Sequence, residues 1–350
     1  MRLAAMLRVR MAWASHEGPR RDVVVSSRIR LARNLAGHPF PPRASPKALA
    51  ASLAAALPVA RKARWLGKPA WVPLGEVDEI DRAFLVERRL ISALLARDPR
   101  HRGVVVGERE LLSVMLNEED HLRLQGVDSG LCLEGLLEEV LSLDDELASG
   151  LAYAFDRRLG HLTTCPTNAG TGLRASALVH LPALALTGRL PALLEGLSRL
   201  RMTARGLYGE GTQVLGDFYQ VSNASTLGAS EETLARSVTK AVGTLAAKEL
   251  EARQSLAGPQ RRTPTEDLVW RAVGALANAR TLPYPEAMRH LSLARMALAL
   301  GWKVPSSLPE VDELMLLAQP AHVQMLAGKA LAEGERDFLR AELLRRKFKA

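Results

Sequence analysis

The sequence of 350 residues contains little cysteine, few aromatic residues and no long apolar run. Its 2 cysteines, Cys132 and Cys165, cannot form a disulfide framework or a zinc site with four cysteine ligands. Aromatic residues make up 4% of the chain, which is few for a surface that stacks nucleic-acid bases. No stretch approaches the roughly 18 apolar residues of a membrane-spanning helix. We therefore expect a soluble, cytoplasmic protein that binds neither nucleic acid nor a membrane.

Lysine is also scarce, whereas arginine is abundant. The chain has 47 basic and 38 acidic side chains and a formal net charge of +9, yet only 9 of the basic residues are lysines. A GC-rich genome, which favours arginine codons, explains most of this bias. A planar guanidinium also binds phosphate or carboxylate through two parallel hydrogen bonds, which lysine cannot do. Some of the arginines are therefore candidates for an anion-binding site.

Hydrophobic patterning predicts a domain of strands and helices in the first part of the chain. Alternating or β-branched segments, which are typical of strands, occupy residues 23–25, 104–106, 112–116, 122–125, 199–207 and 217–222. The polar residues 117–121 predict a turn. Helices are predicted at residues 44–57 and 174–187, and after Ser230, which precedes two glutamates as an N-cap does.

The composition changes at residues 254–265, which we interpret as a linker. Thr263 and Glu266 have the spacing of a capping box, with Pro264 at the first helical position. Helical patterns then occupy residues 266–280, 285–300, 310–318 and 335–348. We expect an α+β domain at residues 1–255 and an all-helical domain at residues 256–350.

Three carboxylates are adjacent at Glu118, Glu119 and Asp120. Adjacent carboxylates repel one another unless cations offset their charge. A solvated turn is the simplest interpretation. A metal site that includes His121 is an alternative, but neighbouring residues of an extended chain point in opposite directions, which disfavours it. No metal ligands are therefore assigned.

Two glycine-containing segments are candidates for ligand binding. Gly170 and Gly172 precede the helix predicted at residues 174–187, where backbone N–H groups can face an anion, although a plain helix entrance is the commoner explanation. Cys165, near this helix start, is either a thiol of lowered pKa or a buried, inert cysteine. Glu210 is flanked by glycines, which suits either a loop that closes on a ligand or a plain hairpin.

Several arginines are spaced as an anion site requires. Arg28 and Arg30 lie two residues apart, so in an extended segment they share one face. With Arg123, Arg174 and Arg205 they would form a clamp of five arginines around a polyanion. The sequence has neither a P-loop nor the Val-Ala-Ile-Lys motif of protein kinases. The physical hypothesis is therefore an arginine-lined phosphate site with separate carboxylates.

Four motifs, in order, resemble the phosphagen, or ATP:guanidino, kinase family. They are residues 26–34 (SSRIRLARN), 117–123 (NEEDHLR), 165–175 (CPTNAGTGLRA) and 205–211 (RGLYGEG). The resemblance covers about residues 13–250. It implies an antiparallel sheet flanked by helices, of the glutamine-synthetase-like kind. It also implies transfer of a phosphoryl group from ATP, with Mg²⁺, to a guanidinium.

Within the family, the chain is similar to the bacterial protein-arginine kinases (the McsB type). Small-molecule guanidino kinases carry a helical domain before the arginine motif, whereas here the motif begins at Ser26 and a helical region follows. Residues 336–341 (RDFLRA) match a motif that binds phosphoarginine as an allosteric site in this branch. Taken alone, that segment would be a solvated helix face with an Asp–Arg pair. The allosteric site would comprise Arg336, Asp337, Phe338, Leu339, Arg340 and Ala341.

The resemblance also implies roles for individual residues. Glu118 would orient the substrate guanidinium and accept its proton, Glu210 would be the second orienting carboxylate, and Cys165 would be the active-site cysteine. The ATP-binding residues would be Ser26, Ser27, Arg28, Ile29, Arg30, Arg123, Arg174, Ala175, Ser176, Ala177, Leu178, Arg205, Gly206, Leu207, Tyr208, Gly209 and Glu210.

Two departures from the branch pattern bear on this site. Arg89 replaces the usual histidine, and Thr212-Gln213 replaces Ser-Glu, which removes a carboxylate. The leading hypothesis is a protein-arginine kinase. Because of these departures, a non-catalytic adaptor that binds phosphoarginine remains an alternative hypothesis, and a small-molecule guanidino kinase is the other. The resemblance further implies arginine-containing client proteins, a zinc-binding activator protein, a Clp-type protease that receives marked clients during stress, and a homodimer.

Overall fold

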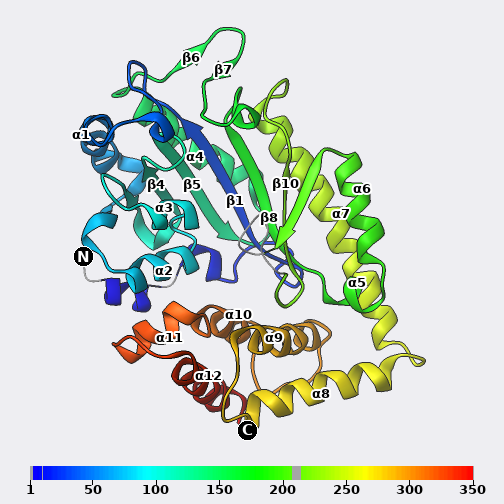
Figure 1. The fold of residues 1–350 in the computed structure, drawn as a ribbon. Helices are drawn as coiled ribbons and strands as arrows, with labels where there is room; N and C mark the ends of the chain where they lie inside the picture. The colour runs from blue at the N-terminus through cyan, green and yellow to red at the C-terminus, as the bar shows by residue number, and fades with distance from the viewer. Residues whose placement is uncertain (1–2, 10, 207–213, 350) are drawn as a thin grey trace. The chain divides into compact units, whose positions relative to one another are not determined.

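The computed structural model describes residues 3–9, 11–206 and 214–349, with strands and helices mixed in the first part and helices after it (Figure 1). The strands are β1 (Val24–Arg33), β2 (Ala70–Pro73), β3 (Gly103–Val106), β4 (Leu112–Leu116), β5 (Leu122–Ser129), β6 (Phe155–Asp156), β7 (Gly160–His161), β8 (Leu173–His180), β9 (Met202–Gly206) and β10 (Phe218–Asn223). The helices are α1 (Pro46–Lys62), α2 (Glu79–Glu87), α3 (Ala93–Arg97), α4 (Leu133–Ala148), α5 (Pro182–Leu186), α6 (Leu190–Arg199), α7 (Glu231–Ala257), α8 (Arg262–Asn278), α9 (Tyr284–Ala299), α10 (Leu308–Leu317), α11 (Pro320–Ala327) and α12 (Glu333–Phe348). Among the helices in these ranges, none is both long and apolar enough to span a bilayer.

Eight of the described strands form one sheet in the order β2-β3-β4-β5-β1-β8-β10-β9. The pairs β2–β3, β3–β4, β4–β5 and β1–β5 are antiparallel. Strands β6 and β7 form a separate two-stranded ribbon. An antiparallel sheet flanked by helices, followed by helices alone, confirms the expected fold class.

The chain is divided into two compact units. Unit 1 comprises residues 1–18, 26–177 and 222–239, and unit 2 comprises residues 19–25, 178–221 and 240–350. Strands β1, β8 and β10 and helix α7 therefore each begin in one unit and end in the other.

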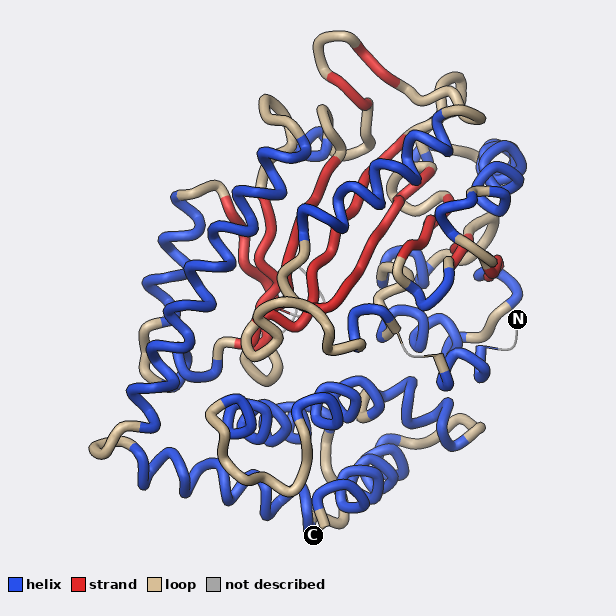
Figure 2. The backbone as a smooth tube through the Cα atoms, turned by 180° about the vertical axis from the view of Figure 1, so that it is seen from behind, coloured by secondary structure: helices blue, strands red, loops and turns tan. Residues whose placement is uncertain are grey.

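Side chains alternate along β1 and β5, and this alternation decides which residues lie on each face of the sheet within unit 1. In the β1–β5 register, Ile29 is opposite Gly126 and Leu31 is opposite Leu124, so these residues share one face. Helices cover this face of the sheet (Figure 2). A Cβ at Gly126 would lie 2.8 Å from Leu136 of α4, so the glycine lets that helix pack closely. The opposite face carries the polar side chains of Arg28, Arg30, Arg123 and Gln125, together with the apolar Val127 and Met115.

Most elements predicted from the sequence are confirmed. Strands lie at or near all six predicted segments, α1 and α7 begin close to the predicted positions, and Ser230 accepts the N–H of Thr233 at 3.3 Å as an N-cap. The predicted turn at residues 117–121 does separate β4 from β5.

The helix predicted at residues 174–187 is wrong. Residues Leu173–His180 form strand β8, and helix α5 begins only at Pro182. The Gly-x-Gly turn at residues 170–172 predicted a helix start at this point. In β8, however, every residue except Arg174 is buried. A strand buried on both faces shows no apolar–polar alternation, so its pattern resembles that of a buried helix.

The linker prediction is also wrong in extent. Helix α7 continues to Ala257 and α8 begins at Arg262, so only residues 258–261 connect them. The predicted capping box fails because Thr263 already lies inside α8. The hydroxyl of Thr265 donates instead to the carbonyl of Arg261 at 2.7 Å. Helix α11 was not predicted.

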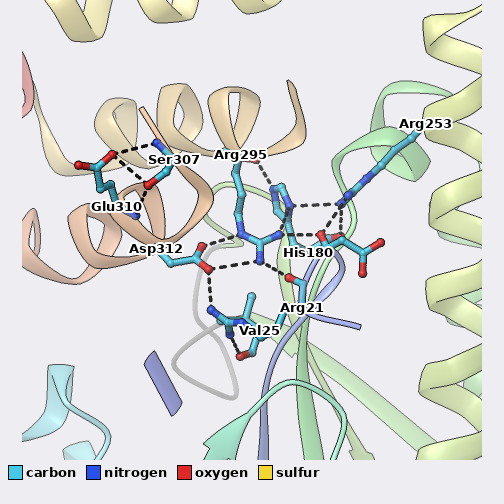
Figure 3. Close-up of polar contacts among 10 residues, drawn as sticks. Arg21, Val25, His180, Arg253, Arg295, Ser307, Glu310 and Asp312 are labelled. Atoms are coloured by element: carbon cyan, nitrogen blue, oxygen red, sulfur yellow. Dashed lines mark hydrogen bonds and ion pairs between the residues drawn. The ribbon is translucent and has the colours of Figure 1, made fainter. Parts of the chain in front are cut away.

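A buried ionic network lies in the core of unit 2 (Figure 3). Arg295 Nε donates to Asp312 Oδ1 at 2.7 Å, and Arg21 donates to Asp312 Oδ2 at 2.8 Å. Arg295 also donates to the main-chain carbonyls of Arg21 at 2.7 Å and Asp22 at 2.9 Å. These bonds tie helices α9 and α10 to the segment that precedes β1.

His180, the last residue of β8, completes this network. Its Nδ1 lies 3.1 Å from Arg295 and its Nε2 lies 2.8 Å from the hydroxyl of Ser292. A guanidinium can only donate, so Nδ1 must accept and the proton is on Nε2. Burial and the neighbouring Arg295 and Arg253 hold the pKa of His180 well below its usual range. The ring is therefore neutral.

Candidate active site

An arginine cluster occupies the polar face of the sheet in unit 1. Arg28 and Arg30 project from β1, Arg123 from β5 and Arg174 from β8. Burial and repulsion from Arg123, Arg89 and Arg174 lower the pKa of Arg28 to about 9, against the attraction of Glu118. Burial followed by repulsion from Arg28, Arg123 and Arg174 also holds the pKa of Arg30 well below its usual range. The predicted two-residue spacing therefore does place these cations together.

Two of the side chains that accept hydrogen bonds from this cluster are neutral. Gln125 Oε1 accepts from Arg28 Nε at 2.7 Å, and the hydroxyl of Ser222 accepts from Arg174 at 3.1 Å and 3.2 Å. Neutral acceptors do not cancel positive charge. The half-buried guanidinium groups repel one another, and an incoming polyanion would remove that repulsion.

Among the described residues, the carboxylate of Glu118 forms an ion pair with this cluster. Its Oε1 accepts from Arg123 at 2.6 Å and from the hydroxyl of Ser92 at 2.5 Å, and its Oε2 accepts from the N–H of Glu119 at 2.8 Å. Burial raises the pKa of Glu118, but Arg123, Ser92, the Glu119 N–H and Arg30 outweigh burial and leave it below its usual value. Glu118 is therefore an ordered anion with 5% of its surface exposed.

The acidic turn is not solvated, so the simplest interpretation of its sequence was wrong. Asp120 is 3% exposed and accepts from the Asn34 side chain at 2.6 Å and from the N–H of Thr164 at 2.7 Å. His121 Nδ1 accepts the N–H of Leu35 at 3.2 Å, and burial followed by the effect of His38 lowers the pKa of His121 to about 4. These contacts hold the turn that carries Glu118 in place.

Cys165 lies beside the acidic turn. The preceding residue, Thr164, binds Asp120 through its N–H and donates its hydroxyl to the carbonyl of Glu119 at 2.8 Å. Cys165 Sγ is half-buried and 3.0 Å from the hydroxyl of Thr167. Cys165 thus directly follows a residue that is hydrogen-bonded to the acidic turn.

Gly170 and Gly172 do not lead into a helix, so the predicted anion site at a helix N-terminus is wrong. Gly172 has a φ of +66° and precedes strand β8. A Cβ there would lie 2.6 Å from the carbonyl oxygen of Ala32 and 2.7 Å from Arg33. The glycine is needed because β8 approaches β1 closely at this point.

The other predicted nucleotide residues are distributed unevenly. Ser26 accepts from Arg89 at 2.8 Å, whereas Ser27 donates to the carbonyl of Gly130 at 2.8 Å. The side chains of Ile29, Ala175, Ala177 and Leu178 are buried in the core, and Ser176 is buried against β1. Arg205 and Gly206 end β9 in unit 2. Leu207, Tyr208, Gly209, Glu210, Thr212 and Gln213 lie outside the described residues.

Among the described residues, three that contact the arginine cluster or Glu118 were not predicted from the sequence. Arg89, known there only as a departure, adds a guanidinium near Arg28 and stacks 4.6 Å above the ring of Trp13. Gln125 joins the carbonyl of Arg89 to Arg28, and Ser92 holds Glu118. Only Gln125 had a signal, because it lies two residues after Arg123 on the same strand face.

The segment 336–341 lies on α12 in unit 2. Arg340 is 1% exposed and donates to the carbonyls of Ala318 at 2.6 Å and Leu282 at 2.9 Å, as well as to Asp337 at 2.5 Å. Arg336 is half-buried and donates to the carbonyl of Leu331 at 3.0 Å. The segment is therefore not a simple solvated face.

Comparison with known proteins identifies the family. Residues 61–252 match the ATP:guanido phosphotransferase C-terminal catalytic domain, and residues 262–350 match the protein-arginine kinase McsB C-terminal domain. The chain is 42% identical over 346 residues to a protein-arginine kinase of Symbiobacterium thermophilum, covering 98% of both chains. It is 41% identical over 341 residues to one of Pelotomaculum thermopropionicum, covering 96% of this chain and 95% of the relative.

Solved structures agree at the level of the fold. Lombricine kinase superimposes with a TM-score of 0.58 at 24% identity, over 71% of each chain. The duplicated taurocyamine kinase from Schistosoma mansoni, with bound transition state analog components, superimposes with a TM-score of 0.60 at 25% identity, over 75% of this chain and 38% of that chain. The family match and the sequence relatives show that the chain belongs to the ATP:guanido phosphotransferase family and, within it, to the protein-arginine kinases.

Proposed function

We propose that this protein transfers the γ-phosphoryl group of ATP to arginine side chains of proteins. The observation that carries the proposal is the half-buried arginine cluster with the ordered carboxylate of Glu118 at its edge. The cluster suits a triphosphate, and the carboxylate suits a guanidinium. The names of the relatives and the match at residues 262–350 support proteins, in place of free arginine, as the substrate.

The substrate guanidinium determines what Glu118 must do. Its pKa of about 12.5–13.8 places a neutral, nucleophilic nitrogen roughly 8 kcal/mol uphill at pH 7. A carboxylate of lowered pKa is too weak a base to offset this cost of removing the proton from the guanidinium. It can fix the line of attack, and correct placement of two reactants lowers a barrier by about 7–11 kcal/mol. As the N–P bond forms and the bond from phosphorus to ADP breaks, the proton passes to Glu118.

The arginine cluster would stabilise the phosphates. Negative charge spreads over the equatorial oxygens during phosphoryl transfer, and Arg28, Arg30, Arg123 and Arg174 would stabilise it. We include Arg205 and the remaining residues that the resemblance implies in the same nucleotide site. Glu118 already accepts hydrogen bonds from three donors, so we do not assign it as a Mg²⁺ ligand. A Mg²⁺ ion would instead be held by the nucleotide phosphates and water, and the residues present fit that arrangement.

Two further residues have proposed roles at the guanidinium. Glu210 would grip a second guanidinium nitrogen, as the motif match implies. Cys165 would lie beside the guanidinium, and the hydrogen bonds of Thr164 to the acidic turn support this placement.

We also propose that residues 336–341 bind phosphoarginine. Arg336 would be the accessible guanidinium, while the three bonds of Arg340 hold α12 in shape. Replacing Arg336 with alanine should remove the response of the kinase to added phosphoarginine. A full response would refute the site.

The cellular setting is a proposal drawn from the family. Clients would be arginine-containing proteins, handed to a Clp-type protease under stress, with a zinc-binding activator and a homodimeric kinase. A cytoplasmic location agrees with two free cysteines, Cys132 and Cys165, since disulfides are rare in that compartment.

Mass spectrometry at neutral pH tests the proposed activity, because phosphoarginine is acid-labile. An arginine-rich protein incubated with Mg·ATP should gain phosphoarginine. Glu118→Gln should lose most of this activity, and Glu138→Gln, an exposed glutamate on α4, should not. Phosphorylation of free arginine alone would indicate a small-molecule kinase, and partner binding without any transfer would indicate an adaptor.

A further inference from the structure

Ser92 performs two tasks with one hydroxyl group. It is the N-cap of α3, where its oxygen accepts the N–H of Leu95 at 3.0 Å. The hydroxyl proton remains free for another partner, and it points to Glu118 Oε1 at 2.5 Å. The cap fixes the position of the oxygen, and the oxygen in turn restrains the carboxylate.

The donors to Glu118 differ in what else they must do. The N–H of Glu119 belongs to the same turn and moves with it. Arg123 belongs to the arginine cluster, so a bound triphosphate would compete for its guanidinium. The hydroxyl of Ser92 comes from a different element and carries no charge that a phosphate would attract.

We propose that Ser92 is a positioning residue for phosphoryl transfer, whose hydroxyl keeps Glu118 in place while Arg123 turns to the nucleotide. This inference rests on the proposed function, in particular on Glu118 as the carboxylate that grips the substrate guanidinium. It concerns a residue outside the four motifs that carried the family resemblance.

Charged groups around Glu118 predict a pH signature. Arg123, Arg30 and Arg28 favour its ionised form, and the neighbouring carboxylate of Glu119 disfavours it. The Ser92 hydroxyl adds a hydrogen bond that favours the ionised form. Removal of the hydroxyl therefore raises the pKa of Glu118, and the acid limb of the kcat/KM profile should move to higher pH.

Four variants separate positioning from helix capping. Ser92→Ala removes the cap and the bond to Glu118, whereas Ser92→Gly spares most of the capping energy and still loses that bond. Ser92→Thr keeps both. Ser45→Ala is the matched control, because Ser45 caps α1 by accepting the N–H of Ala48 at 3.2 Å and, within the described part of the chain, makes no hydrogen bond to a carboxylate.

The expected result is a roughly 10- to 100-fold loss of kcat in Ser92→Ala and Ser92→Gly, the usual worth of a hydrogen bond to a charged group. The KM for ATP should stay within about twofold, the acid limb should shift upward, and Ser92→Thr should recover most of the activity. Ser45→Ala should behave as the unmodified protein.

Other outcomes overturn the inference. A Ser92→Gly variant with unchanged kcat and pH profile shows that the hydroxyl does no positioning. Equal losses in Ser92→Ala and Ser45→Ala, with full activity in Ser92→Gly, reduce Ser92 to a cap. If Glu118→Gln abolishes phosphoarginine formation, the proposed function stands whatever Ser92 does; if Glu118→Gln is fully active, both ideas about Glu118 and Ser92 fail.

Discussion

Replacing Asp312 with asparagine should strongly destabilise unit 2. Asp312 is the carboxylate between Arg21 and Arg295, at 2.8 Å and 2.7 Å, and its side chain is 2% exposed. Asparagine has nearly the same shape but no charge, and its amide group would point hydrogen atoms at a guanidinium that can only donate. Two buried cations would then lose their shared anion.

The magnitude follows from the cost of leaving a buried charge unpaired. Removal of one partner from a buried ion pair costs about 3–5 kcal/mol. For a domain of about 150–250 residues, 1 kcal/mol lowers Tm by about 2–4 °C. We therefore expect Tm to fall by roughly 6–20 °C in a thermal unfolding scan at neutral pH.

Asp267→Asn provides the matched control. Asp267 makes a pair of the same kind on α8, at 2.8 Å from Arg271, but both side chains are more than half exposed. Exposed pairs contribute about 0–1 kcal/mol, so this variant should unfold close to the unmodified protein. If Asp312→Asn also unfolds within about 1 °C of the unmodified protein, the ionic network does not stabilise the fold.

Three further changes test other parts of the structure. Gly172→Ala should destabilise by more than about 1 kcal/mol in chemical unfolding because φ is +66° and the new Cβ would meet a backbone oxygen, whereas Gly135→Ala in α4, with no atom within 4 Å, should stabilise by about 0.5–1 kcal/mol; equal effects would refute the close-approach argument. Arg340→Ala should lower Tm markedly because it removes bonds to two carbonyls and a carboxylate, and Arg336→Ala, with one recorded bond, should lower it little. The pKa of His180 is lowered in the folded state, so the unfolded state gains a proton first as pH falls below about 6.5. Tm should therefore drop between pH 7.5 and pH 5.5, and this drop should shrink in His180→Gln; an unchanged slope would contradict the neutral, buried ring.

Local patterning was sufficient where one chain segment decides the geometry. Arg28 and Arg30 share a face because the side-chain period of a strand is two, and the structure confirms this. The turn between β4 and β5 followed from its polar residues. The helix after Ser230 followed from its cap and its acidic first turn. The four motifs placed the chain in its family before any tertiary contact was known.

Local patterning failed where packing decides. Residues 173–180 have the composition of a buried helix, and only their place inside the sheet makes them β8. The acidic turn is charged enough to be solvated, yet Asn34, Thr164 and Arg123 from separate segments satisfy its carboxylates. No spacing rule relates those positions to one another.

The sequence by itself determined the family and the two-residue strand period that puts Arg28 and Arg30 on one face. It also identified Glu118, the acidic residue proposed to face them. Only the tertiary structure decided that Ser92 reaches Glu118, that Arg89 joins the arginine cluster, and that Arg340 is buried and not exposed to solvent. The physical reason is range. Periodicity and caps act over one or two turns of chain, whereas a buried charge is stabilised by whichever distant group the fold brings within hydrogen-bond reach.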